Sequence, residues 1–149
     1  MPEFTCFTLS PKFNPTTAAL IEPLTIGTYS VELAQTDFRN KTVGIFGAGP
    51  IGLSVLMVLK TMDTAKILSF EPLEYRREKA QSLGANYVFN PFEVSAAEVT
   101  QQVEPLLLDV VFDCSGEQQA IDDAVRIIKP GGKLILVGIP PEGKYTINM

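Results

Sequence analysis

The chain has 149 residues, of which 46% are hydrophobic, and this is enough for one domain with a sizeable core. Twelve basic residues stand against seventeen acidic ones, a net charge of -5, without a basic cluster that could neutralise a phosphate backbone, so we expect no nucleic-acid partner. Residues 42–59 carry no charge, but four glycines and a proline interrupt them and no signal peptide is evident, so we expect no membrane span and a cytoplasmic protein.

The sequence contains no histidine, and its two cysteines, Cys6 and Cys114, are too far apart to form a Cys-x-x-Cys pair. We therefore expect no zinc site built from this chain alone and no histidine general base. No histidine or lysine stands beside Cys114 to lower its pKa, which favours a small buried residue over a nucleophile. If the chain belongs to an enzyme, its chemistry comes from a cofactor or from residues outside this sequence.

Residues 1–40 precede the first predicted strand and differ from the rest of the chain. Residues 1–14 are irregular, and residues 15–35 read as a helix that is interrupted or restarted at Pro23, because proline breaks the hydrogen bonding of a helix interior. We expect residues 1–40 to be a lead-in segment and not a domain.

From residue 41 onward, short β-rich runs alternate with helical patterns. The predicted strands are residues 42–46, 66–70, 86–89, 109–113 and 133–137, and the predicted helices are residues 50–61, 73–83, 94–104 and 117–128. The strands are apolar without strict alternation, which indicates burial on both faces, and their alternation with helices requires parallel pairing. The sequence therefore predicts an α/β fold over residues 41–149, a Rossmann-type doubly wound parallel sheet with helices on both faces.

A glycine-rich segment, Gly47-Ala48-Gly49-Pro50-Ile51-Gly52, joins the first predicted strand to its helix. A G-x-G-x-x-G pattern in this position is typical of dinucleotide binding. Gly47 permits a tight turn, Gly49 lets a pyrophosphate approach the backbone, and Gly52 lets helix and strand pack closely. Free amides and the helix dipole then face the anion. The alternative is a glycine-rich turn that serves packing alone.

Glu71 ends the second predicted strand, nineteen residues after Gly52. A carboxylate there accepts hydrogen bonds from an adenosine ribose and repels a 2′-phosphate by about 1–4 kcal/mol, so we favour NAD over NADP. Arg76 could lie along the adenosine, but it could also serve a 2′-phosphate, which keeps NADP as an alternative. The other interpretations are a solvated acid that caps the next helix and an ordinary surface arginine.

Ligands of open parallel sheets bind in a crevice beyond the carboxyl ends of the strands. Two further strand ends are expected to lie at this crevice, together with the glycine-rich segment and Glu71. Cys114 and Ser115 follow the fourth predicted strand, and Val137, Gly138 and Ile139 end the fifth. Backbone groups at both places could hold a nicotinamide, although structural turns explain these segments nearly as well.

Two rival functions come from other classes. A methyltransferase also places a glycine loop after its first strand and an acid after its second, but its loop usually carries an acid before the glycines, and residues 43–46 contain none. A non-catalytic nucleotide-sensing module is the second rival.

An ordered set of motifs carries a resemblance to a known family. The set is "AALIEPLTIGTYSV", "VGIFGAGPIGL", Glu71 followed by Arg76, "SLGANYVFNP", "DVVFDCSG" and "KPGGKLILVGIP". Together they resemble the cofactor domain of the zinc-containing medium-chain dehydrogenase/reductase family, nearest to its sorbitol and threonine dehydrogenase branch. The resemblance implies an NAD(P)-dependent oxidoreductase of an alcohol or polyol, in which zinc polarises the substrate hydroxyl and hydride passes to the nicotinamide.

The resemblance also implies roles for single residues. Pro50 and Ile51 would line the pyrophosphate and the nicotinamide ribose, Val137 to Ile139 would meet the nicotinamide, and Glu71 with Arg76 would hold the adenosine ribose. Glu22 matches the family acid at or just behind the catalytic zinc. From its own residues, Glu22 is only a polar residue before a helix-breaking proline.

The departures from the family pattern are as informative. The domain that supplies the zinc ligands has no counterpart in this sequence, nor has the final strand of the family sheet, so we expect a fragment that holds no zinc and catalyses nothing alone. A missing sixth strand would leave residues 133–137 as an apolar sheet edge, which invites pairing with another chain. We therefore expect a homo-oligomer, or a rearranged tail, residues 140–149, that covers this edge.

Overall fold

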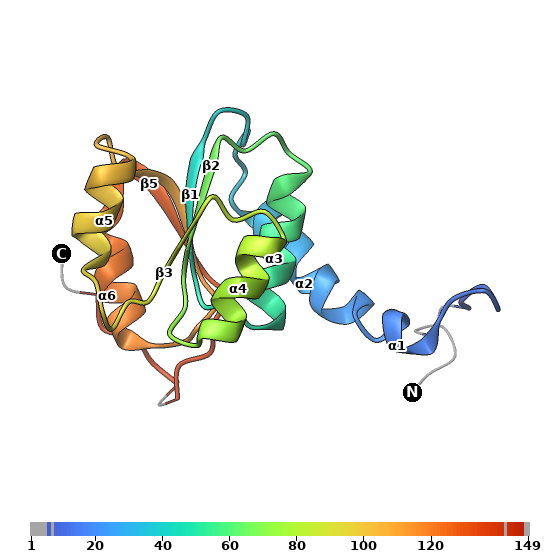
Figure 1. Ribbon diagram of the computed structural model, residues 1–149. Helices are drawn as coiled ribbons and strands as arrows, with labels where there is room; N and C mark the ends of the chain where they lie inside the picture. Colours follow the sequence, from blue (N-terminus) through green and yellow to red (C-terminus); the bar gives the residue numbers. More distant parts are fainter. Residues whose placement is uncertain (1–5, 7, 142, 148–149) are drawn as a thin grey trace.

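The computed structural model describes residue 6, residues 8–141 and residues 143–147 of the chain. It contains five strands, β1 (Thr42–Phe46), β2 (Lys66–Phe70), β3 (Tyr87–Phe89), β4 (Leu108–Asp113) and β5 (Ile128–Leu136). The helices of the described residues are α1 (Pro15–Ala18), α2 (Ile21–Leu33), α3 (Pro50–Lys60), α4 (Glu74–Ser82), α5 (Ala96–Val103) and α6 (Gln118–Ile127) (Figure 1).

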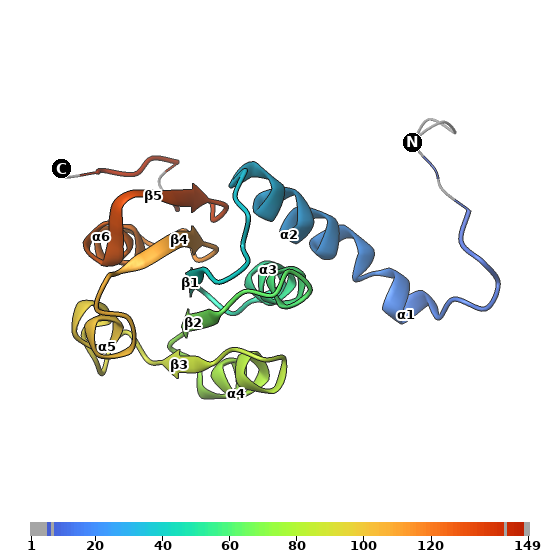
Figure 2. The same ribbon diagram turned by 90° about the horizontal axis from the view of Figure 1, so that it is seen from above.

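The strands form one parallel sheet in the order β3-β2-β1-β4-β5. The chain moves outward from β1 to β3 and then crosses back to place β4 on the other side of β1, so the direction of winding reverses between β1 and β4. Helices α2, α3 and α4 cover one face of the sheet, and α5 and α6 cover the other (Figure 2). The predicted doubly wound α/β fold is confirmed.

The core lies in two layers because β1 is buried on both faces. Val43 and Ile45 belong to the layer that faces α2 and α3, whereas Phe46 packs with Leu68 and Phe70 in the layer that faces α5 and α6. Strands enclosed in this way need no alternation of polar and apolar residues, which is the pattern that the sequence shows.

Residues 15–35 form two helices, but the second helix starts two residues before Pro23, the position that the sequence indicated. Helix α1 ends at Ala18, and α2 begins at Ile21, so Pro23 lies inside the first turn of α2. Proline is tolerated there because the first amides of a helix have no intrahelical acceptor. Helix α2 then packs on α3 so closely that a Cβ on Gly27 would lie 2.7 Å from the Cβ of Ser54.

Strand β5 begins earlier than the predicted strand 133–137. It starts at Ile128 and contains the turn-forming residues Pro130, Gly131 and Gly132. The register with β4 shifts between Leu108 and Val110, and Gly131 adopts a φ of 77°. The turn-forming residues therefore produce an irregular start to the strand and do not precede it.

Partly exposed ion pairs join neighbouring segments at the amino end of the sheet. The Asp109 carboxylate accepts a hydrogen bond from the Thr42 amide at 2.8 Å and also contacts the ammonium groups of Lys41 and Lys129. The Glu104 carboxylate accepts hydrogen bonds from the Thr42 hydroxyl at 3.0 Å and from the Lys66 ammonium at 3.2 Å.

We expect acid to weaken the fold through Glu104. Hydrogen bonds from Lys66 and Thr42 hold the pKa of Glu104 below its ordinary value of 4.5, so its stabilising contribution is present above that pH and is lost as the pH falls through the folded-state pKa. Glu104→Gln should lower the free energy of unfolding in urea by about 0.5–1 kcal/mol near neutral pH, since Lys66 is partly exposed, and by less in acid.

The control is Glu93→Gln, which changes an exposed carboxylate after β3. It should leave the pH dependence of the unfolding free energy unchanged. An equal loss at neutral and acid pH for Glu104→Gln would contradict the assignment.

Candidate functional site

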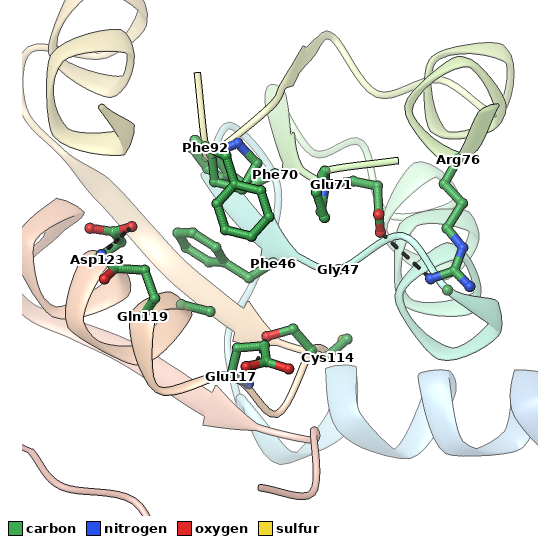
Figure 3. A pocket seen from close by; sticks show the side chains of 15 residues that line it. Phe46, Gly47, Phe70, Glu71, Arg76, Phe92, Cys114, Glu117, Gln119 and Asp123 are labelled. Carbon is green, nitrogen blue, oxygen red and sulfur yellow. Dashed lines mark hydrogen bonds and ion pairs between the residues drawn. The ribbon is translucent and has the colours of Figure 1, made fainter. Parts of the chain in front are cut away.

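A pocket of about 430 Å³ opens at the carboxyl ends of β1, β2 and β4, where the winding of the sheet reverses. It is lined by Phe46, Gly47, Gly49, Phe70, Glu71, Pro72, Arg76, Pro91, Phe92, Cys114, Ser115, Glu117, Gln119, Ala120 and Asp123 (Figure 3). In an open α/β sheet this reversal is the place where ligands bind, because the loops that leave the two neighbouring strands diverge there.

Two glycines of the loop after β1 are required by the fold itself. Gly47 has a φ of 87°, a conformation that side chains rarely adopt, and its amide donates a hydrogen bond to the Phe70 carbonyl at 2.8 Å. A Cβ on Gly52 would lie 1.9 Å from the Gly47 carbonyl oxygen. Close packing of α3 against the loop therefore excludes any side chain at Gly52.

Gly49 is different, because the protein leaves space beside it. A Cβ on Gly49 would meet only the Arg76 Nη1 atom among the described residues, at 3.8 Å. Its φ of −71° and ψ of −174° are open to any residue, and it caps α3 without a side-chain hydrogen bond. The first amides of α3, at Ile51 and Gly52, have no acceptor within their own helix. Bare backbone amides with free space in front of them can receive an anion.

Glu71 joins this loop to the second strand. Its side chain is 3% exposed, its Oε2 atom accepts a hydrogen bond from the Ala48 amide at 2.7 Å, and its Oε1 atom accepts one from the Leu73 amide at 3.0 Å. The carboxylate is therefore buried, unlike the solvated acid of the alternative interpretation. It does contact the start of the next helix, because Leu73 is the N-cap residue of α4. Each oxygen keeps a lone pair that a hydroxyl group could use.

Arg76 extends from α4 over the glycine loop. Its Nη1 atom lies 4.0 Å from the Glu71 Oε2 atom, and its Nε atom donates a hydrogen bond to the Tyr75 hydroxyl at 3.1 Å. The guanidinium lies 5.7 Å from the centre of the Tyr75 ring. Arg76 is half-buried and separates the pocket from an apolar groove of about 600 Å³ between α2, α3 and α4, which Pro50 lines.

Aromatic rings that the sequence analysis did not select form the middle of the pocket. Phe46 and Phe70 are stacked with ring centres 4.5 Å apart, and Phe92 is 79% exposed and lies beside them (Figure 3). Phe46 and Phe70 are partners in the register of β1 and β2. Because each is the last residue of its strand, the sequence could have indicated that both lie at the carboxyl end of the sheet, where the pocket is. Phe92 lies in the loop after β3, where no pattern marks it.

Cys114 and Ser115 follow β4 and line the pocket as predicted for that strand end. Burial, together with the neighbouring Asp113, raises the pKa of Cys114 to about 12, so its thiol stays protonated at neutral pH. The Ser115 hydroxyl donates a hydrogen bond to the Asp113 Oδ1 atom at 2.6 Å. The interpretation of Cys114 as a small buried residue and not a nucleophile agrees with this environment.

Val137, Gly138 and Ile139 lie next to β4 but do not line the pocket. The Val137 and Gly138 amides each donate a hydrogen bond to the Asp113 carbonyl at 2.8 Å, and Ile139 is 87% exposed. The tail then turns toward α6, where the Thr146 amide donates a hydrogen bond to the Gln118 side chain at 2.9 Å.

Glu22 lies exposed in the first turn of α2. Within the described part of the chain, no three His, Cys, Asp or Glu side chains gather closely enough to hold a metal ion. These residues therefore do not fit a zinc ion, and the Glu22 assignment stays a prediction. No helix among the described residues is long and apolar enough to cross a membrane.

Comparison with known proteins identifies the family. The family model described as "Zinc-binding dehydrogenase" matches residues 50–149. Sorbitol dehydrogenase 1 of Saccharomyces cerevisiae is 35% identical over 137 residues, which cover 87% of this chain and 37% of that protein. L-threonine 3-dehydrogenase of Pyrococcus horikoshii is 36% identical over 135 residues, 90% of this chain and 38% of that protein.

Solved structures agree with these relatives. A zinc-binding dehydrogenase of Sinorhizobium meliloti bound to NADP is 25% identical with a TM-score of 0.84, over 95% of this chain and 42% of its own. A protein of Escherichia coli described as a short chain alcohol dehydrogenase and complexed with NADH is also 25% identical, with a TM-score of 0.86, over 99% of this chain and 43% of its own. The chain therefore spans about two fifths of these proteins. It belongs to the zinc-dependent medium-chain dehydrogenase family and corresponds to the nucleotide-binding region of that family.

Proposed function

We propose that this chain binds NAD across the carboxyl ends of β1, β2 and β4, as the dinucleotide-binding domain of an alcohol or polyol dehydrogenase. The observation that carries the proposal is the open space at Gly49, which packing within the protein does not explain. A pyrophosphate placed there accepts hydrogen bonds from the amides of Ile51 and Gly52 at the positive end of α3. No acidic residue in the first turn of α3 opposes it.

The two halves of the dinucleotide then have separate places. The adenosine ribose lies at Glu71 and Arg76, and the adenine enters the aromatic part of the pocket between Phe46, Phe70 and Phe92. The nicotinamide half extends from Cys114 and Ser115 toward Val137, Gly138 and Ile139. Pro50 and Ile51 lie along the pyrophosphate and the nicotinamide ribose.

The choice of NAD over NADP rests on the buried Glu71 carboxylate. A 2′-phosphate on the adenosine ribose would approach this buried negative charge, whose ion-pair partner Arg76 lies 4.0 Å away, while Arg77 donates a hydrogen bond to the Glu71 backbone carbonyl at 2.9 Å. Two more acidic side chains, Glu117 and Asp123, line the same pocket. The ribose of NAD brings hydroxyl donors in place of a phosphate, and carboxylates accept from them.

Catalysis is a property that we assign to a longer protein. Zinc would polarise the substrate hydroxyl there, with Glu22 on the metal side, but the residues described in this chain do not assemble a metal site. We infer that the chain alone binds the dinucleotide and oxidises no alcohol.

We further propose that β5 mediates self-association. It is one of the two edge strands of the sheet, the other being β3, and Leu136 at its end is 45% exposed. Among the described tail residues, Thr146 is hydrogen-bonded to Gln118 and Tyr145 to Asp113 and Gly138, and these hydrogen bonds do not run along the backbone of β5. An uncovered edge offers a row of backbone donors and acceptors to a second copy of the chain.

Isothermal titration tests the binding proposal. NAD should give saturable binding to the 149-residue chain and S-adenosylmethionine none, while the chain with NAD and a polyol should form no NADH. Gly49→Ala should weaken NAD binding at least tenfold, because the new Cβ occupies the space of the pyrophosphate, and should change the unfolding free energy by less than about 1 kcal/mol.

The matched variant is Gly52→Ala. Its Cβ would collide with the Gly47 carbonyl, so the unfolding free energy itself should fall by about 2 kcal/mol or more. Unaltered NAD affinity in Gly49→Ala would show that no pyrophosphate approaches this loop.

Glu71→Gln should narrow the preference between the two cofactors. The native chain should bind NAD about tenfold more tightly than NADP, and the variant should bind NAD less tightly and NADP nearly as well as NAD, because the buried negative charge is gone. The exposed Glu74→Gln, three residues along, serves as the control. Tighter binding of NADP than of NAD by the native chain would refute the role of Glu71.

Sedimentation velocity tests whether the chain self-associates through the exposed edge of β5. The native chain should associate at high concentration, and Leu136→Lys should shift it toward the monomer, because a charge on an edge strand opposes pairing. Leu106→Lys changes an 80% exposed position before β4 and should leave the association of the chain unchanged. A native chain that sediments as a monomer at every concentration would exclude self-association through β5.

A further inference from the structure

The wall of the pocket opposite Glu71 and Arg76 is formed by α6, which presents Gln119 and Asp123 (Figure 3). The Gln119 Nε2 atom donates a hydrogen bond to the Asp123 Oδ2 atom at 3.1 Å. The Arg126 Nη1 atom donates one to the Asp123 Oδ1 atom at 3.2 Å. The Asp123 side chain is only 13% exposed, whereas Arg126 lies outside the pocket and is 63% exposed.

This chain of contacts fixes the direction of the Gln119 amide. An ionised carboxylate has no proton to donate, so Asp123 can only accept. The NH₂ group of Gln119 must therefore face Asp123, because a flipped amide would place its carbonyl oxygen against the carboxylate. The second hydrogen on Nε2 remains for another partner, and the pocket wall carries a donor directly beside an acceptor.

Adenine matches this pattern on its Watson–Crick edge. Its exocyclic N6 amino group donates, and the neighbouring N1 atom accepts. Hypoxanthine has the reverse order, with a carbonyl at position 6 and a hydrogen on N1. A hypoxanthine carbonyl would therefore face the Asp123 carboxylate, while its N1 hydrogen would face the Gln119 amide hydrogen.

We propose that Gln119 and Asp123 read the edge of the base and select adenine over hypoxanthine. The inference rests on the proposed dinucleotide function. Phe46, Phe70 and Phe92 supply surface for the base but do not distinguish purines, since each purine offers a similar flat face. The edge contacts supply the discrimination, with Asp123 as acceptor from N6 and Gln119 as donor to N1. Arg126 is a positioning residue that holds Asp123.

The same helix provides an internal control. Gln118 donates to Asp122 at 3.0 Å, an identical pair displaced by one residue. Neither residue lines the pocket, and the Gln118 side chain also donates to the Thr146 carbonyl at 2.7 Å. Asp122→Asn therefore makes the same chemical change on the same helix, away from the proposed base.

The experiment is a titration of the 149-residue chain with NAD and with its deamino analogue, nicotinamide hypoxanthine dinucleotide. The native chain should bind NAD about tenfold more tightly. Asp123→Asn should reduce this ratio to within about twofold, because an amide can also donate and so accommodates the hypoxanthine carbonyl. Asp122→Asn should keep the native ratio, and Phe92→Ala should weaken both dinucleotides by the same factor. Thermal melting of each variant verifies that it is folded.

Titrations with AMP and IMP repeat the comparison without the nicotinamide half and should give the same order. Equal affinity of the native chain for both members of each pair overturns the base-reading role while leaving dinucleotide binding intact. A native preference that survives in Asp123→Asn also overturns it. Failure of every nucleotide and dinucleotide to bind overturns the proposed function, and the base preference with it.

Discussion

The buried Glu71 carboxylate is the contact on which the geometry of the crevice depends. It accepts hydrogen bonds from the amides of Ala48 and Leu73, so one side chain connects the loop after β1 with the start of α4. A buried carboxylate without donors would be costly, and the two amides supply them. The loop is therefore held in shape by the protein alone. A ligand that binds to it does not have to order it first, which removes one cost of association.

The three glycines of the loop divide into two physical classes. Gly47 and Gly52 are needed because of a positive φ and a carbonyl contact, and they would be needed in a turn that bound nothing. Gly49 satisfies neither condition. Glycine is a common N-cap residue, but neither the dihedral angles nor the packing at Gly49 requires it, and the open space beside it is what a bound anion would use.

Periodicity and punctuation predicted the sheet well because buried parallel strands leave a strong local signal. Strands β1 and β2 have the predicted bounds, and helix α3 ends one residue before its predicted end. The predicted start of β5 was five residues too late, since the strand already begins at Ile128, which pairs with Leu108, and passes through Pro130 and two glycines before the regular pairing resumes at Lys133. Local propensity suggests a turn there, and tertiary pairing overrides it.

The site was predictable only where a motif encodes it. The glycine loop and Glu71 follow from spacing, but Phe92, Gln119 and Asp123 are contributed by a loop and a helix whose approach to the pocket depends on how two crossover connections dock. A glutamine and an aspartate four residues apart occur twice in succession on α6, and the sequence does not tell which pair faces the pocket. Only the orientation of α6 decides that.

An acidic chain that binds an anionic ligand presents an apparent conflict, which the arrangement of charges resolves. The net charge of -5 acts at long range and is screened within about 8 Å at physiological salt. At the site, Glu71 and Asp123 lie on two opposite walls and Glu117 also lines the pocket, while the proposed position of the pyrophosphate is at the first amides of α3. The walls accept hydrogen bonds from neutral donors, hydroxyl and amino groups, and repel phosphate. Negative charge is favoured at the start of α3, where Arg76 also extends over the glycine loop, and this supports the proposed place of the pyrophosphate.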